Sequence, residues 1–238
     1  MTFSPAVRKL FISWKHGDLL DKLEASHQQL IERRQNSVEF PCPDELVQRT
    51  ASNCRVVQQV QLHRTERLIV GIGNMLLENN VYGLALSVRG HYEATAVLGY
   101  ICDRLRSLKA KQIEFDNFAL NVACVVLGAK HPQFPKAPNP PNILECIAKA
   151  DRYLDSHLFK EKKGMLRDSY DWLSEFVHPN FCGNSTAYTI DRESHRVVFR
   201  HDDQPRNSDF DLVSYLVISA GFFIILFDRV NASLTDFP

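Results

Sequence analysis

This sequence has no excess of positive or of negative charge. Its 28 lysines and arginines are balanced by 28 aspartates and glutamates, so the formal net charge is zero. Such a chain has no overall field that draws it toward nucleic acid or toward an anionic membrane. Any contact with RNA must therefore depend on local clusters of cations.

Closely spaced cysteines are missing as well. The six cysteines lie far apart among apolar neighbours, and no two of them have the short spacing of zinc-binding or redox motifs. We therefore expect buried, reduced thiols. The first residues contain no apolar signal core, and the sequence predicts a cytoplasmic protein that is not inserted in a membrane.

The common signatures of hydrolases, nucleotide-binding loops and zinc proteases do not occur. The chain contains no Gly-x-Ser-x-Gly, no Walker loop and no His-Glu-x-x-His. Metal ligation by His91, Glu93 and His178 is conceivable, but the Glu-x-x-His pairs of helical di-iron sites are missing. We predict no metal and no other cofactor.

Long stretches of apolar residues at helical spacing dominate what the sequence does contain. Apolar residues make up 45% of its 238 residues, which is enough for one sizeable core or two small ones. After two short helices within residues 1–35, the spacing predicts helices over 44–78, 81–108, 113–128, 142–157, 165–178 and 212–227. The last of these is too short to span a membrane and is predicted to be buried.

The segments between these helices have a different character. Loops are predicted at 131–141, 181–184 and 204–209, with Asp209 as a helix cap. The β-rich residues 186–202 predict a two-stranded hairpin, which needs neighbouring helices for its stability. The predicted fold class is therefore mainly α. Residues 1–42 form an N-terminal helical extension, and residues 43–238 form a helical bundle with the hairpin before the C-terminal helix.

The stretch Tyr170-Asp-Trp-Leu-Ser-Glu-Phe-Val-His178-Pro-Asn180 predicts a helix that ends on a histidine. Tyr170, Ser174 and His178 would form one stripe of that helix, and Pro179 disfavours helical geometry beyond it. The negative end of the helix dipole favours the charged form of His178, which would let it exchange protons near neutral pH. The other interpretation is that His178 caps carbonyl groups and that the stripe is structural.

A second polar stretch, Ser87-Val-Arg89-Gly-His91-Tyr-Glu93, interrupts an otherwise apolar helix. Burying Arg89 or Glu93 alone is costly, so we expect each to pair with the other or with a close neighbour. The pair either fixes the register of the bundle or belongs to a site. We predict that the two stretches meet in the core of the bundle.

The same helix ends in four cations, Arg104, Arg106, Lys109 and Lys111. Two interpretations remain open for this end of the helix. It is either a solvated helix end or a patch that contacts phosphate groups.

Together, SVRGHYEA and YDWLSEFVHPN resemble the motifs of an uncharacterised bacterial family, over roughly residues 45–185. That family has an Arg-x-x-x-Glu helix and a later Tyr-x-x-Leu-Ser-x-x-x-His-Pro helix end. It looks like a relative of the HEPN superfamily, whose helical bundles occur in prokaryotic toxins and antiviral defence systems. The resemblance implies a defence or toxin role, a homodimer and, if the protein is an enzyme, an endoribonuclease that needs no metal.

The resemblance also implies a role for each of four side chains. His178 would act as general acid or base, and Arg89 would stabilise charge that develops on the phosphate. Glu93 would orient Arg89, and Tyr170 would donate a hydrogen bond to the site.

Many HEPN proteins instead carry an Arg-x(4–6)-His pair on one helix, with two copies meeting across a dimer. Arg152 and His157 match this spacing at the end of a predicted helix and remain an alternative pair. Arg196 and His201 match it too, but they fall in the predicted hairpin.

The alternative function is a non-catalytic helical module that binds a protein partner or a nucleotide. In that case Arg89, Glu93, Tyr170 and His178 form a buried structural network. Exposure distinguishes the two functions. A catalytic site requires Arg89 and His178 within about 5 Å of each other in an open cleft, whereas a structural network is sealed and mutually satisfied.

Overall fold

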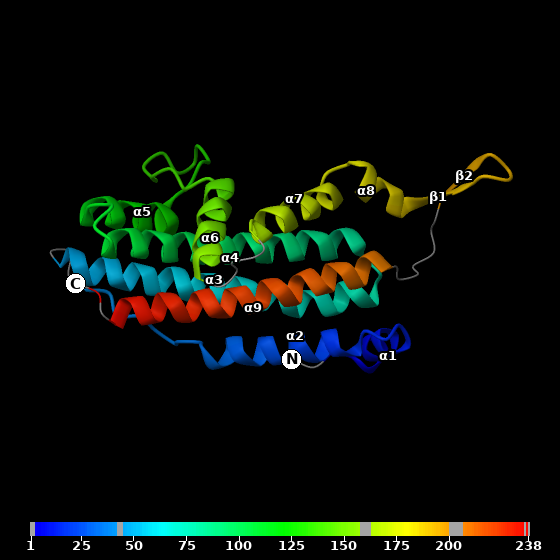
Figure 1. The fold of residues 1–238 in the computed structure, drawn as a ribbon, viewed down its shortest axis with the longest axis horizontal. Helices are drawn as coiled ribbons and strands as arrows, with labels where there is room; N and C mark the ends of the chain where they lie inside the picture. Colours follow the sequence, from blue (N-terminus) through cyan, green and yellow to red (C-terminus); the bar gives the residue numbers. More distant parts are fainter. Residues whose placement is uncertain (1–2, 42–44, 158–162, 200–206, 236, 238) are drawn as a thin grey trace.

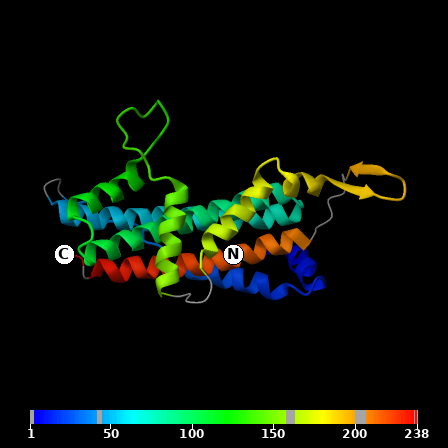
Figure 2. The same ribbon diagram turned by 45° about the horizontal axis from the view of Figure 1, so that its top comes forward.

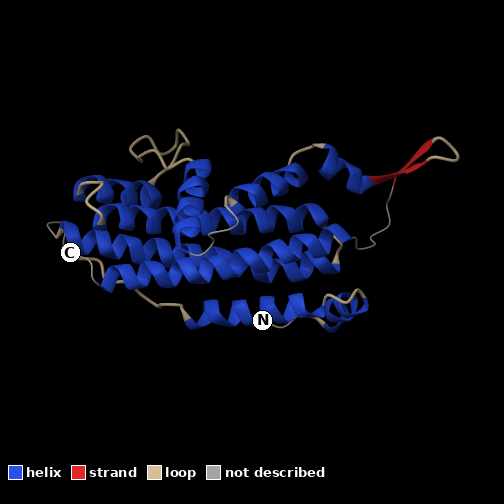
Figure 3. Cartoon of the chain, viewed as in Figure 1, coloured by secondary structure: helices blue, strands red, loops and turns tan. Residues whose placement is uncertain are grey.

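A computed structural model describes the chain except for residues 1–2, 42–44, 158–162, 200–206, 236 and 238. The described residues form a mainly α bundle with one β-hairpin before the last helix (Figure 3), which confirms the predicted fold class.

Three long helices lie side by side along the molecule (Figure 1): α3 (Leu46–Leu77), α4 (Val81–Lys109) and α9 (Asn207–Thr235). Helix α4 is the centre of the bundle and packs against α3, α6, α7 and α9. It carries buried apolar residues on nearly all its faces, as a helix enclosed by neighbours must. Polar residues on its enclosed faces, such as His91 and Asp103, therefore meet other helices rather than water.

Shorter helices cover this centre: α1 (Pro5–Ser13), α2 (Gly17–Glu32), α5 (Phe115–Leu127), α6 (Ile143–His157) and α7 (Met165–Val177). Helix α1 begins where the sequence predicts, with Pro5 in the first turn and the Ser4 hydroxyl accepting a hydrogen bond from the Val7 N–H. Helix α2 packs against α9. Apolar side chains of α1 and α2, such as Phe11 and Leu23, belong to the same core as those of the later helices.

Helix α6 crosses α4 at a steep angle in both ribbon views (Figures 1 and 2). The two helices touch at Gly99 of α4 and Ala150 of α6, where a Cβ added to Gly99 would lie only 2.3 Å from the Ala150 Cβ. This approach is possible because glycine has no side chain. It brings Asp103, one turn further along α4, against Arg152 of α6.

Two predicted loops are wrong in part. Residues 181–184 form a short helix, α8 (Phe181–Asn184), followed by a 3-10 turn (Ser185–Ala187). Pro179 ends α7, but a proline just before a new helix does not prevent that helix from starting. Helix α9 already begins at Asn207, so Asp209 lies inside its first turn, where a carboxylate is favourable near the helix dipole. Residues 204–206 lie outside the described residues.

Helix α9 is a core helix in this structure, as predicted for its apolar segment. Over Asp209–Thr235 it is long and apolar enough to cross a membrane, but 61% of its apolar window is buried inside the molecule. Leu212, Leu216 and Phe223 have no exposed surface. The helix spans 29 residues, so it is longer than the predicted 212–227. Its polar ends continue the helix beyond the apolar run that the sequence reveals.

The hairpin consists of β1 (Tyr188–Asp191) and β2 (Arg196–Phe199), which pair antiparallel with Tyr188 opposite Phe199. It extends away from the bundle (Figure 1) instead of lying beside helices as expected. Ile190, Val197 and Phe199 are largely exposed. Residues 200–202 of the predicted hairpin lie outside the described residues.

Candidate functional site

The two polar stretches meet through Arg89 and Tyr170. The Arg89 Nη2 atom donates a 2.6 Å hydrogen bond to the Tyr170 hydroxyl, which joins α4 to α7. The Glu93 carboxylate lies 3.5 Å from Arg89 Nε and 3.4 Å from Nη2 of Arg64 on α3. The expected pairing of Arg89 with Glu93 is confirmed, and the cluster ties three helices together.

This cluster is mostly enclosed. Tyr170 is 4% exposed, and the side chains of Arg89 and Glu93 are 20% and 28% exposed. The Nε atom of Arg89 is buried without a hydrogen bond, because its distance to the Glu93 carboxylate is too long for one. The geometry is that of a helix joint with one polar edge at the surface, and not of an open cleft.

His178 does not join this cluster. It is the exposed residue that ends α7, and its backbone is extended, with ψ at 154°. It follows Tyr170 by eight residues, or roughly 12 Å along a helix axis. Among the described residues no partner forms a hydrogen bond with its imidazole; only its backbone N–H and C=O are bonded, to Ser174 and Asn180.

His178 ends α7: its N–H still bonds to the Ser174 carbonyl, but Pro179 disfavours helical geometry at His178, so the chain leaves the helix there. The predicted stripe therefore ends at an exposed residue that lies about two helical turns beyond the buried Tyr170. The structure brings Arg89, Glu93 and Tyr170 together and does not bring His178 to them. The catalytic roles given to these four side chains stay predictions.

His91 lies on another face of α4 and is completely buried. Its Nδ1 is 2.8 Å from the Ser219 hydroxyl of α9, and burial lowers the pKa of the imidazole to about 3. The conceivable metal site of His91, Glu93 and His178 is not formed, because His91 faces α9 whereas Glu93 faces Arg64 and Arg89. No other cluster with metal-ligand character occurs in the part of the chain that the structure describes.

A second polar cluster lies where α6 crosses α4. Its centre is the carboxylate of Asp103, which has no exposed surface. Arg106 donates to this carboxylate at 2.7 Å, and Arg152 donates to it through both Nε, at 3.0 Å, and Nη2. A buried carboxylate is tolerated when cations and hydrogen bonds compensate it. Two arginines on one carboxylate leave a positive charge, and their side chains are 32% and 51% exposed.

The hydrogen bonds continue from Arg106 to His157. The Arg106 Nη1 atom donates to the Ser156 hydroxyl at 2.7 Å, and this hydroxyl lies 2.7 Å from Nδ1 of His157. Nδ1 is also 2.8 Å from the Tyr153 carbonyl oxygen, which can only accept a hydrogen bond. We therefore assign the proton of neutral His157 to Nδ1, which leaves the lone pair on Nε2.

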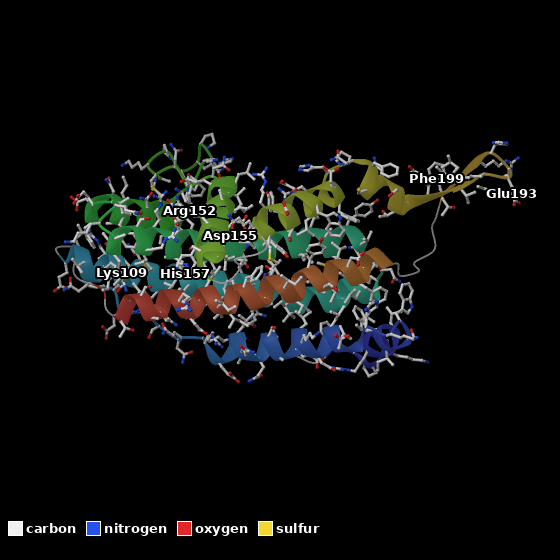
Figure 4. The ribbon with its side chains drawn as sticks, viewed as in Figure 1. Lys109, Arg152, Asp155, His157, Glu193 and Phe199 are labelled. Atoms are coloured by element: carbon white, nitrogen blue, oxygen red, sulfur yellow. The ribbon has the colours of Figure 1, made fainter. Side chains whose placement is uncertain are left out.

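The imidazole of His157 is both exposed and held in place. It stacks on the Tyr153 ring, with the ring centroids 4.4 Å apart. Figure 4 shows Arg152 and His157 on α6, with Lys109 at the end of α4 on the same side of the molecule. An oriented imidazole nitrogen beside partly exposed guanidinium groups can exchange a proton near a bound phosphate.

Sequence reasoning missed Asp103 and Ser156 as members of this cluster. It noted Arg152 and His157 as a matching pair, and Arg106 as part of a basic helix end. Asp103 carries the signal that could have led further: it is the one carboxylate at the basic end of a buried helix, and burial of such a group requires cationic partners.

Comparisons of this chain with models of protein families, with curated proteins and with solved structures found no match.

Proposed function

We propose that this chain is a HEPN-like protein of a prokaryotic defence or toxin system, and that it cleaves RNA without a metal ion. The observation that carries the proposal is the line of hydrogen bonds from Arg152 through Asp103, Arg106 and Ser156 to His157. It connects an Arg-x4-His pair on one helix, which matches the spacing of the pair that many HEPN proteins carry.

The chemistry assigns one step to each group. Nε2 of His157 accepts the proton of a ribose 2′-hydroxyl while the 2′-oxygen attacks the phosphorus atom. The bond from phosphorus to the 5′-oxygen breaks, which leaves a 2′,3′-cyclic phosphate and a 5′-hydroxyl. Arg106 and Arg152 stabilise the charge on the phosphate oxygens. The leaving oxygen takes its proton from a second acid, for which His157 of a second copy in a homodimer is the candidate.

Within this proposal the Arg89 cluster has a supporting role. It fixes α7 on α4 and leaves the reaction to α6. The version predicted from the sequence remains the competing assignment of the same function, with Arg89 on the phosphate and His178 as the proton carrier. The two assignments place the reacting histidine on different helices, so a single pair of variants separates them.

The experiment compares the wild type with His157→Gln, His178→Gln and, as a matched control, His63→Gln, an exposed histidine of α3. Each protein is incubated with a single-stranded RNA in the presence of a chelator, and the new ends are analysed. We expect cyclic phosphate ends with the wild type and the control. With His157→Gln we expect the rate of RNA cleavage to fall by a factor of about 100 or more. If only His178→Gln loses RNA cleavage, the catalytic site lies at the end of α7. An intact RNA with the wild-type protein, purified and also expressed in cells, would contradict the proposal.

A non-catalytic module that binds a protein partner is the second candidate, and the hairpin favours it. Cross-strand neighbours share a face, so Tyr188, Ile190, Val197 and Phe199 form one apolar face. The last three are 64%, 53% and 67% exposed, and exposed apolar surface of this kind marks interaction sites. If this function holds, the double variant Ile190→Ser, Phe199→Ser no longer has the effect on cells that expression of the wild-type protein has. The variant His157→Gln keeps that effect.

A further inference from the structure

We infer that a row of cationic side chains beside His157, formed by Arg104, Arg106, Lys149 and Arg152, binds the phosphodiester backbone of single-stranded RNA. We call these four residues the cationic row. The inference rests on the proposed function for the identity of the polyanion, and it concerns binding, which can be measured apart from cleavage.

The row arises from the crossing of two helices. Glu145, Lys149, Arg152 and Ser156 are spaced by four, three and four residues, so they share one face of α6. Contacts with α4 run along this whole face. Arg104 lies 3.2 Å from the Glu145 carboxylate, and Arg106 donates to Ser156 at the other end. Because Gly99 lets the helices approach closely, cations from α4 and α6 lie near one another along the crossing.

The charge of this surface is not balanced. Four cations face the carboxylates of Asp103 and Glu145, and both carboxylates are bound by arginines. Asp155, one turn after Arg152, lies 3.4 Å from the N–H of Gly164, and its charge still leaves the four cations in excess over the three carboxylates. Lys149 has no ion pair with a described residue; burial lowers its pKa, and the neighbouring Arg104 and Arg152 lower it further. In a chain of zero net charge, such an excess is a local feature that an anion would neutralise.

The shape of the row fits a chain of phosphates better than a single anion. Lys149 precedes His157 by eight residues, which is roughly 12 Å along the axis of α6. Arg152 lies between them and presents a planar guanidinium, the group best suited to phosphate oxygens. A strand that places its scissile phosphate at His157 therefore has further phosphates beside Arg152 and Lys149. The 2′-hydroxyl must be free to attack, and unpaired RNA satisfies this requirement.

The test uses a fluorescent single-stranded RNA with 2′-O-methyl groups at every position, which cannot be cleaved. Anisotropy gives its Kd at several salt concentrations for the wild type, Lys149→Gln and Lys149→Glu. Lys9→Gln, an exposed lysine on α1, is the matched control. We expect the Kd of Lys149→Gln to rise roughly fivefold and the slope of log Kd against log salt to fall by roughly 0.7, the value for one phosphate contact on a single strand. Lys149→Glu weakens binding further, and Lys9→Gln binds like the wild type.

Equal Kd values and equal slopes for Lys149→Gln and Lys9→Gln would overturn the inference. Complete displacement of the RNA by an equal concentration of inorganic phosphate or of a mononucleotide would overturn it too, because a backbone site requires several phosphates. The proposed function fails separately: if His157→Gln binds this RNA like the wild type, and the wild type leaves unmodified RNA intact, the cationic row stands and the cleavage proposal falls. If cleavage depends on His157 but RNA binding does not change in the Lys149 variants, the cleavage proposal stands and the cationic row falls.

Discussion

Helix α4 contributes to two polar clusters, and they differ in which group is buried. Where α4 meets α7, the arginine reaches inward, donates a hydrogen bond to the phenol of Tyr170 and forms an ion pair with Glu93. Where α4 meets α6, the carboxylate of Asp103 is at the bottom and the arginines lie at the surface. Both clusters have two arginines for one carboxylate, but in the first the Arg89 guanidinium turns inward to Tyr170 and joins helices. The second holds positive charge in a fixed position toward solvent, as a site for anions needs.

Removal of the buried carboxylate tests this difference most strongly. We expect Asp103→Ala to lower the free energy of unfolding by about 2–3 kcal/mol, because the charge-assisted hydrogen bonds from Arg106 and Arg152 are lost while both partly exposed guanidinium groups regain water. Glu93→Ala, whose carboxylate is partly exposed, should cost about 1 kcal/mol or less. Urea denaturation of both variants measures the two values. Equal losses would mean that the two clusters do not differ in the way described.

The buried imidazole of His91, on the same helix, should make the stability of the fold depend on pH. An unfolded histidine binds a proton with its usual pKa near 6.5, whereas the folded side chain does so only at about 3. The unfolded state binds more protons between these values, so the stability contribution is complete above pH 6.5 and is lost as the pH falls toward 3. At pH 5 the loss is about 2 kcal/mol.

Urea denaturation at pH 7.5 and pH 5 measures this loss. The variant His91→Gln should show a smaller difference between the two pH values than the wild type, and His63→Gln should show the same difference as the wild type. A His91→Gln protein as acid-sensitive as the wild type would contradict the assignment.

The helix crossing that builds the second cluster depends on Gly99. Gly99→Ala would place a Cβ 2.3 Å from the Ala150 Cβ, and we expect a loss of about 1–3 kcal/mol as the helices separate. Gly221→Ala is the matched control, because no atom lies within 4 Å of an added Cβ there, and it should gain up to about 1 kcal/mol from helix propensity. Thermal denaturation distinguishes the two. Adding Ala150→Gly should restore only part of the stability, because the added Cβ would still lie 2.7 Å from the Ala150 Cα.

The smallest effect is expected at the α4–α7 joint. Tyr170→Phe removes the hydroxyl that accepts from Arg89 and should cost about 1 kcal/mol, because the arginine keeps partial access to water. RNA binding by the cationic row should be unchanged. A marked loss of RNA binding in this variant, with stability retained, would place the anion site at α7 instead.

The helices were predictable from the sequence because apolar residues at helical spacing mark buried faces whatever their partners are. α8 and the full length of α9 were not, since polar residues at helix ends carry little periodic signal. The pairing of Arg89 with a close neighbour followed from the cost of burying a charge, but its contact with the Tyr170 hydroxyl could not be specified from the sequence. The exposure of His178 could not be predicted either, because it depends on which neighbours cover the end of α7. The role of Asp103 depends on the crossing of α4 and α6, which brings in Arg152 from 49 residues further along the chain.

The hairpin has a consequence for the behaviour of the protein at high concentration. In the described part of the chain, both of its strands are edges of a two-stranded sheet. The outward N–H and C=O groups of each strand can pair with a strand of another molecule, and exposed Val197 and Phe199 favour such contacts. The light scattered by solutions of this protein should therefore rise more steeply than in proportion to the protein concentration. A lysine at position 197 or 199 should reduce this excess scattering.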